Sequence, residues 1–277
     1  MIGDQSGSGS GEGRPITANS VLPAIREPIV IRTSDGLDLV GELALPADRE
    51  PVATIVCVHP LPTQGGMMDS HLFRKAAWRL PALAGIAVLR FNTRGTDSVA
   101  GRSDGEFDGG GAEGLDLAAA ISFVRDRDLP NPSLVGWSFG TEVILRHPPD
   151  SPVAGVVLIS PPLSGVAESD LIGWASRPES MIALIPELDD YLRPVEAEER
   201  FAVLPRAELV AVPRARHLWV GEPFVRVVLD TIVRAASPGQ LDGEAGGLPE
   251  CWSGPMRRWS DLAAAAAPPS EPEPRGG

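Results

Sequence analysis

Residues 52–58 form a continuous apolar run, Val-Ala-Thr-Ile-Val-Cys-Val, that is rich in β-branched side chains. Such a run is typical of a parallel strand that is buried on both faces of a sheet. Similar runs recur at residues 86–91, 134–135, 153–159, 181–185 and 207–212. A sheet that is buried on both faces needs helices on both sides, so these runs predict a layered α/β domain.

Helical patterns separate several of the predicted strands. Residues 115–124 and 224–233 carry apolar side chains at helical spacing. Before the first long strand, residues 29–32 and 37–45 flank a Ser-Asp-Gly turn and predict a hairpin. A hairpin followed by strand–helix alternation predicts a mostly parallel sheet with helices on both faces. In such sheets ligands bind beyond the carboxyl ends of the strands, so the chemistry is expected there.

Two pentapeptides match the pattern Gly-x-Ser-x-Gly, one centred on Ser138 and one on Ser103. In enzymes this pattern places a serine on a sharp turn between a strand and a helix, where small glycines allow close packing. Ser138 follows a predicted strand and precedes the helical residues 141–145, whereas Ser103 lies among Gly, Asp and Ser. The context therefore favours Ser138 as a nucleophile and assigns Ser103 to a loop.

A serine nucleophile needs a general base, and the chain contains four histidines. His217 follows the last predicted strand and precedes the last predicted helix, which is the place of the base in the chain order Ser, Asp, His. His59, His71 and His147 occupy positions where a structural role is the simpler interpretation. We therefore expect His217 to be the base.

The acid that orients the base should follow the preceding predicted strand, which ends near residue 185. Glu187, Asp189 and Asp190 follow it. Asp189 is the preferred acid and Asp190 the alternative, because adjacent residues in a turn point in different directions. Glu187 is less favoured, being closer to the strand.

Acyl transfer also needs backbone N–H groups that bind the developing oxyanion. The residue after the nucleophile, Phe139, is expected to supply one of them. The other should come from the loop at residues 59–62, His-Pro-Leu-Pro, in which proline has no N–H. Leu61 is therefore the expected second donor.

Several longer motifs make the sequence similar to a known superfamily. They are His-Pro-Leu-Pro at 59–62, Gly-Gly-Met-Met at 65–68, Arg-Phe-Asn-Thr-Arg-Gly at 90–95, Ser-Asp-Gly-Glu-Phe-Asp-Gly at 103–109, and Glu113 with Asp116. Over residues 29–235 the chain resembles small bacterial serine hydrolases of the α/β-hydrolase superfamily. Leu61, where His is common, and Ala112, where Gly is usual, depart from the pattern. The resemblance implies hydrolysis of esters or related acyl bonds.

The predicted substrate is a small acyl compound. Only about twenty residues, 160–180, separate the strands between which many such proteins carry a helical cap, so the site should be open. Trp137 beside the nucleophile and Trp174 in this short insert are candidate substrate contacts. Carboxylic esters are the first expectation and thioesters the next. A peptidase or amidase, and a non-catalytic binding protein on the same fold, are the alternatives.

Composition bears on partners and location. The formal net charge of −13 argues against binding to nucleic acid or to an anionic membrane surface. Two cysteines, no apolar run long enough to cross a bilayer and no basic, apolar leader favour a cytoplasmic protein, as a monomer or homodimer. The sequence shows no metal-ligand spacing, so no metal or cofactor is expected.

Composition also divides the chain. Residues 1–24 are expected to form a flexible arm, residues 25–237 the hydrolase domain, and residues 238–277 a disordered, low-complexity tail. Trp252 and Trp259 are unusual in such a tail, and docking of the tail onto the body of the protein is the alternative.

Overall fold

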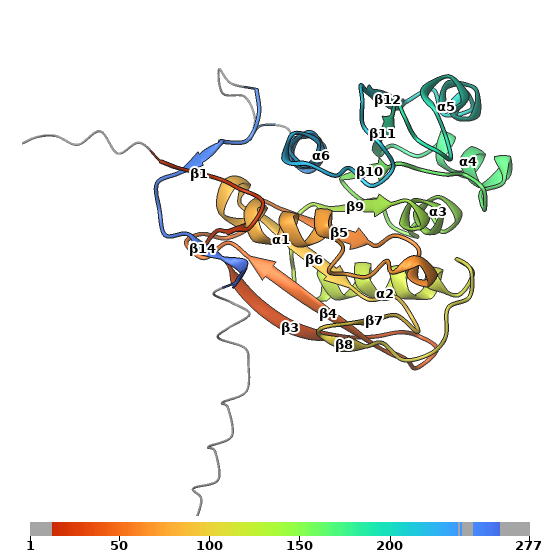
Figure 1. Ribbon diagram of the computed structural model, residues 1–277. Helices are drawn as coiled ribbons and strands as arrows, with labels where there is room; N and C mark the ends of the chain where they lie inside the picture. The colour runs from red at the N-terminus through yellow and green to blue at the C-terminus, as the bar shows by residue number, and fades with distance from the viewer. Residues whose placement is uncertain (1–12, 238, 240–245, 261–277) are drawn as a thin grey trace, which may run out of the picture.

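A computed structural model describes residues 13–237, 239 and 246–260. At its centre lies an eight-stranded sheet with the order β12-β11-β10-β9-β5-β6-β4-β3 (Figure 1). In chain order these strands are β3 (Ile25–Arg32), β4 (Asp38–Leu45), β5 (Ala53–Val58), β6 (Ile86–Phe91), β9 (Pro132–Trp137), β10 (Gly155–Ile159), β11 (Ser180–Pro186) and β12 (Ala207–Val212).

The sheet is parallel from β6 to β12 and antiparallel at one edge. β5 pairs in parallel with β6 and β9, and the parallel pairing continues through β10 and β11 to β12. β3 and β4 form an antiparallel hairpin, and β4 joins β6, also antiparallel. Every residue of β5 and β6 is buried, as their largely apolar sequences predict. The one charged residue among them, Arg90, forms ion pairs with Glu42 and Asp69.

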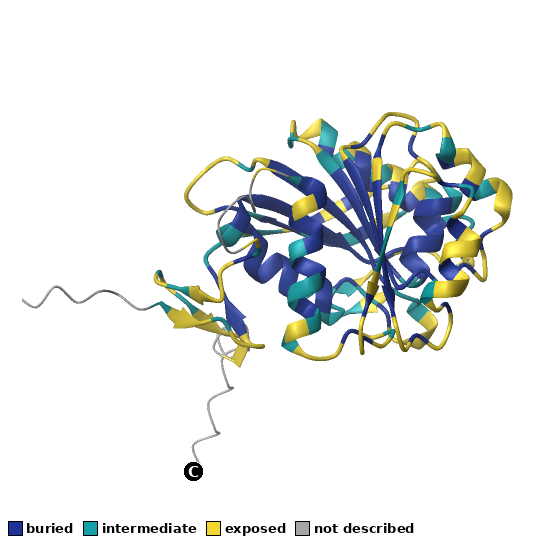
Figure 2. Ribbon diagram, turned by 90° about the horizontal axis from the view of Figure 1, so that it is seen from above, coloured by how far each residue is buried: buried dark blue, intermediate teal, exposed yellow. Residues whose placement is uncertain are grey.

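Helices cover both faces of this sheet (Figures 1 and 2). Helices α1 (His71–Ala84) and α6 (Glu222–Ala236) pack into one apolar core, and the remaining α-helices pack into a second core on the other face. Those helices are α2 (Glu113–Asp126), α3 (Phe139–Arg146), α4 (Glu168–Ala175) and α5 (Pro194–Phe201). The expected mostly parallel sheet with helices on both faces is confirmed. Among the described residues, no helix combines the length and hydropathy needed to cross a bilayer.

Segments near the two ends of the chain lie side by side, outside the main sheet. β1 (Arg14–Pro15) pairs with β13 (Cys251–Trp252), and β2 (Ser20–Val21) pairs with β14 (Arg257–Arg258), both antiparallel. The Trp259 ring lies 5.2 Å from the Trp78 ring of α1.

Residues 13–24 and 246–260 fall in the expected arm and tail, and in the structure they contain these four paired strands. Two-residue strands have no period that a sequence pattern can show. The other residues of the expected arm and tail lie outside the described residues, and the division into domains stays a prediction.

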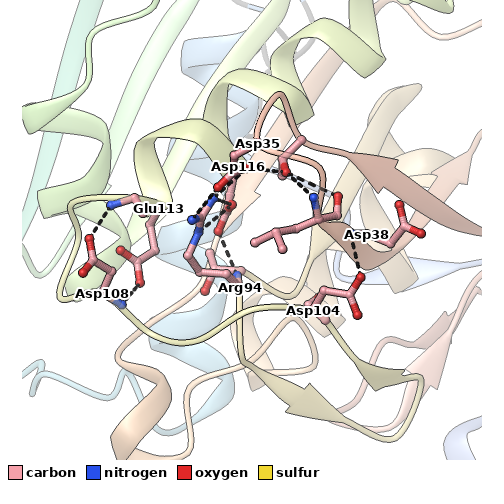
Figure 3. A network of polar contacts seen from close by, with 12 residues as sticks. Asp35, Asp38, Arg94, Asp104, Asp108, Glu113 and Asp116 are labelled. Carbon is pink, nitrogen blue, oxygen red and sulfur yellow. Dashed lines mark hydrogen bonds and ion pairs between the residues drawn. The ribbon is translucent and has the colours of Figure 1, made fainter.

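A buried polar network explains two of the sequence motifs (Figure 3). The Arg94 guanidinium donates to the Asp116 carboxylate of α2 over 2.7 and 3.0 Å and to Asp35 in the β3–β4 turn over 3.0 Å. The Glu113 carboxylate accepts the N–H groups of Asp108 and Gly110, both over 2.8 Å. These motif residues therefore tie the hairpin edge to α2 and hold the connecting loop.

Candidate active site

Ser138 occupies a strained turn between β9 and α3. Its backbone has φ 52° and ψ −119°, outside the regions that non-glycine residues usually adopt. A Cβ at position 140 would come within 2.0 Å of the Val58 carbonyl oxygen, and one at position 136 within 2.7 Å of Gly140. Glycine at both positions therefore lets α3 approach the end of β5, which leaves the Ser138 side chain above the sheet.

The structure brings Ser138, His217 and Asp189 together at the carboxyl ends of the strands. His217 Nε2 lies 2.8 Å from Ser138 Oγ, and His217 Nδ1 lies 3.1 and 3.0 Å from the two carboxylate oxygens of Asp189. Because Asp189 accepts the Nδ1 proton, Nε2 is free to accept the proton of Ser138 Oγ. Asp189 is 2% exposed, whereas Asp190 is exposed and has no hydrogen bond to His217 among the described residues.

Three buried side chains hydrogen-bond, directly or through one another, to the backbone carbonyl oxygen of His217. The Trp137 indole N–H donates to the His217 carbonyl oxygen over 3.2 Å, and Ser160 Oγ donates to the same oxygen over 3.3 Å. Ser160 Oγ in turn accepts the indole N–H of Trp219 over 2.7 Å. Trp137, which the sequence marks as a substrate contact, is only 2% exposed, so its main contacts are within the protein.

Tyr191 covers the outer side of His217, a contact that the sequence analysis missed. The two ring centroids are 4.5 Å apart with an angle of 52° between the planes. The Tyr191 N–H donates to Asp189 Oδ1 over 2.9 Å, which also restrains the carboxylate. The sequence contained one clue to this contact: Tyr191, the only tyrosine in the chain, stands two residues after the expected acid.

His59 fixes the loop that carries Leu61. Its Nε2 accepts the Thr93 N–H over 3.0 Å, and its Nδ1 therefore donates to the Pro60 carbonyl oxygen over 2.7 Å. Complete burial lowers the pKa of His59 to about 4, so the ring is neutral at pH 7. This histidine has a structural role, as the sequence analysis expects.

Of the two expected oxyanion donors, Phe139 directly follows Ser138 in the chain, and Leu61 lines the same pocket as Ser138. Leu61 precedes the 3₁₀ turn η1 (Pro62–Gln64), and Phe139 is the first residue of α3. Within the part of the chain that the structure describes, neither N–H donates to a backbone or side-chain acceptor. Both N–H groups therefore remain candidates for the oxyanion donors.

Ser138 opens into a pocket of about 270 Å³. Leu61, Trp137, His217 and Leu218 line it, together with the loop residues Gln64, Gly65 and Gly66 and the start of α1. His71 also lines the pocket, and its Nε2 hydrogen-bonds to the Leu218 carbonyl oxygen over 2.7 Å. The pocket is small and has no carboxylate among its lining residues.

Trp174 does not lie in this pocket, so the expectation that it overhangs the site is wrong. Its indole N–H donates to the Leu145 carbonyl oxygen of α3 over 3.0 Å, and its ring is buried in the core. The short insert forms one helix, α4, which turns this side chain inward. The site is therefore left without a cover from the insert.

The other candidates from the sequence have structural partners. Ser103 is fully buried, donates to the Asn92 carbonyl oxygen over 2.8 Å and accepts the Val40 N–H over 2.9 Å. His147 hydrogen-bonds to the Gly110 carbonyl oxygen over 2.7 Å. In the residues that the structure covers, no three His, Cys, Asp or Glu side chains could hold a metal ion together.

Solved structures of hydrolases resemble this one. A serine hydrolase without a lid from Xanthomonas campestris shares 26% identity, with a TM-score of 0.64, over 77% of this chain and 96% of that chain. An esterase from Pyrococcus furiosus shares 19% identity, with a TM-score of 0.61, over 77% of this chain and 94% of that one. The chain has an α/β-hydrolase fold. The expected fold without a substantial cap is thereby confirmed.

Comparison of sequences gives less information about this chain than comparison of structures. No family model matches the sequence. An uncharacterized protein from Rickettsia prowazekii is 30% identical over 135 residues, which cover 46% of this chain and 52% of that protein. The matched segment thus spans about half the length of that relative. The resemblance to the motif-bearing bacterial hydrolases stays a prediction.

Proposed function

We propose that this protein is a serine hydrolase that cleaves carboxylic esters or thioesters through an acyl-enzyme on Ser138. The observation that carries the proposal is the hydrogen-bonded series Ser138, His217 and Asp189, with 2.8 Å between Ser138 Oγ and His217 Nε2. This separation is within reach for proton transfer to a general base. It also argues against the alternative of a non-catalytic protein on a retained fold.

In the first half of the reaction, Ser138 Oγ attacks the carbonyl carbon of the ester while its proton passes to His217 Nε2. Asp189 stabilises the resulting imidazolium and keeps its Nδ1–H directed at the carboxylate. The carbonyl oxygen gains negative charge, which the N–H groups of Phe139 and Leu61 stabilise. The C–O or C–S bond then breaks, and the imidazolium returns its proton to the leaving alcohol or thiol.

In the second half, water attacks the acyl carbon and gives a proton to His217 Nε2. The bond between the acyl carbon and Ser138 Oγ breaks, Ser138 regains its proton and the carboxylic acid leaves. His59, which is neutral, holds the Leu61 loop without adding a charge beside the oxyanion. The protein thus needs only its own side chains and N–H groups for both halves.

The pocket favours small acyl esters over peptides. Its volume of about 270 Å³ suits a short acyl chain, and no cap encloses a longer one. An aminopeptidase needs a negative group to bind the substrate amine, and none of the residues that line this pocket carries one. We further propose a cytoplasmic monomer or homodimer, in keeping with the two free cysteines.

Ester hydrolysis by matched variants tests the proposal. The wild type should hydrolyse p-nitrophenyl acetate and butyrate faster than aminoacyl anilides, and Ser138→Ala should lose at least 10³-fold in kcat. Ser103→Ala serves as the matched control, because Ser103 has the same flanking glycines but lies buried. Hydrolysis that survives Ser138→Ala, or is lost in a folded Ser103→Ala variant, contradicts the proposal.

A further inference from the structure

A second pocket, of about 390 Å³, is lined by His217 and includes no residue of the Leu61 loop. Its walls are the side chains of Arg214 and Arg216, the apolar residues Leu218, Val220 and Phe224, and Asp190. His217 and Leu218 line both this pocket and the one around Ser138. A ligand that occupies both would therefore pass over the imidazole.

The loop that carries the two arginines is fixed by hydrogen bonds. Arg214 has φ 60°, and its N–H donates to the Glu187 carboxylate over 2.7 Å. The carbonyl oxygen of the fully buried Ala215 accepts the Leu188 N–H over 3.0 Å. With Ala215 anchored in the core, the side chains on either side of it are held at the surface, against the pocket. The arginines are thus presented from a rigid backbone.

Both guanidinium groups are available to a ligand. Among the described residues, neither Arg214 nor Arg216 forms an ion pair, although the chain has thirteen more formal negative than positive charges. Asp190 is the one carboxylate that lines the pocket, which leaves the arginines in excess. Leu218 and Val220 are 58% and 74% exposed, so apolar surface for the rest of a ligand lies beside the charges.

The position of the pocket indicates which part of a substrate it takes. In acyl transfer the imidazolium gives its proton to the leaving group, so the leaving group lies next to His217. The carbonyl oxygen must lie at the Leu61 and Phe139 N–H groups, in the first pocket. The second pocket, which touches His217 but not Leu61, is the place for the leaving alcohol or thiol.

We propose that the second pocket binds an anionic leaving group, an alcohol or thiol that carries a carboxylate or phosphate, through Arg214 and Arg216. This inference rests on the proposed function, because it extends the same active site. Arginine suits either anion, since its planar guanidinium donates two parallel hydrogen bonds. The substrate class is accordingly an acyl ester or thioester with a negatively charged leaving group.

Three acetate esters with the same acyl group test the inference. 4-Acetoxybenzoate carries a carboxylate, 4-acetoxyphenyl phosphate carries a phosphate, and 4-acetoxybenzamide is the neutral reference. For each, kcat/KM of the wild type is divided by that of the variant Arg214→Gln/Arg216→Gln. We expect the loss for the anionic esters to exceed the loss for the amide by roughly tenfold, the size of a charge-assisted hydrogen bond. The excess should shrink at 0.5 M KCl.

Arg206→Gln is the matched control. Arg206 is also exposed, but it precedes β12 whereas Arg214 follows it, so the two lie at opposite ends of one strand. The loss of kcat/KM in this variant should be equally small for all three esters. The inference is overturned if Arg214→Gln/Arg216→Gln lowers kcat/KM equally for the charged and the neutral esters. It is also overturned if Arg206→Gln shows the same excess loss for the charged esters as Arg214→Gln/Arg216→Gln. The leaving-group class is the anion, carboxylate or phosphate, whose ester shows the larger excess loss of kcat/KM over the amide.

A binding measurement separates this inference from the proposed function. With Ser138→Ala protein, ligand-detected NMR compares 4-hydroxybenzoate and 4-hydroxyphenyl phosphate with 4-hydroxybenzamide. Tighter binding of an anion that is lost in Ser138→Ala/Arg214→Gln/Arg216→Gln supports the pocket even if no ester is hydrolysed. Equal binding of the charged and neutral compounds contradicts it, whatever the enzyme's activity.

Discussion

The indole N–H of Trp137 donates to the carbonyl oxygen of His217 over 3.2 Å, so the residue next to the proposed nucleophile holds the backbone of the proposed base. Because Trp137 and Ser138 are adjacent in sequence, this bond closes a short path between the two reacting groups. The distance between Ser138 and His217 is therefore restrained by a hydrogen bond from the end of β9, and does not depend on the loop after β12 alone. Precise placement of this kind is where proximity contributes to rate.

Trp137→Phe should lower kcat roughly tenfold, which is about 1.4 kcal/mol in activation free energy, with a smaller change in KM. The ring volume is largely kept, but the His217 carbonyl loses one donor. Stopped-flow kinetics on p-nitrophenyl acetate measure the effect. Trp174→Phe is the control, because that buried indole also donates to a carbonyl oxygen, over 3.0 Å, away from the site. A similar loss of kcat in both variants would mean that the effect is only structural.

Ser160→Ala should lower the free energy of unfolding by about 1–3 kcal/mol, because it leaves the fully buried Trp219 indole N–H without its acceptor. Urea denaturation measures the change. The double variant Ser160→Ala/Trp219→Phe should lose clearly less free energy of unfolding than the sum of the losses in the two single variants, because donor and acceptor are removed together. Additive losses would show that the hydrogen bond does not couple these residues.

Tyr191→Ala should lower kcat/KM about three- to tenfold, because the ring that packs on His217 is worth about 0.5–1.5 kcal/mol. Tyr191→Phe keeps the ring and should retain nearly full activity. The pH profile of kcat/KM adds a second readout, since water reaches the imidazole once the ring is gone. Equal kinetics and equal profiles for all three proteins would exclude a role for the ring.

His59 should make folding sensitive to acid. Its pKa is lowered from 6.5 to about 4 by burial, so between these values the unfolded chain binds a proton that the folded protein does not. Its contribution to stability is therefore complete above pH 6.5 and is lost as the pH falls toward 4, by at most about 3 kcal/mol. Urea midpoints at pH 7, 6 and 5 should fall less steeply for His59→Gln than for the wild type. Parallel slopes would contradict the neutral, buried histidine.

Much of this fold follows from local sequence. β5 and β6 are buried throughout and apolar except at Thr54 and Arg90, and their bounds match the predicted runs within one residue. Gly136 is likewise required locally, because a side chain there would meet the backbone of Gly140 and Thr141, whereas Gly140 is required by the approach of Val58 from β5. Position in this order of strands also predicted that Ser138 and His217 would lie together, and their side chains are 2.8 Å apart.

Other features depend on tertiary contacts that no local pattern contains. Asp189 and Asp190 are adjacent in a turn, and only burial beside His217 separates their roles. Trp174 was a candidate substrate contact because it lies in the short insert, but the direction of its side chain depends on packing against α3. Tyr191 approaches His217 across 26 residues of chain, which sequence spacing alone does not predict.

The site of covalent labelling tests the central claim most directly. The wild-type protein is treated with a fluorophosphonate, digested, and the modified peptide sequenced by mass spectrometry. The account predicts one phosphonylated residue, Ser138, and loss of labelling in His217→Ala, where Oγ has no base. Modification at Ser103, or labelling that persists unchanged without His217, would contradict the assignment of Ser138 as the nucleophile.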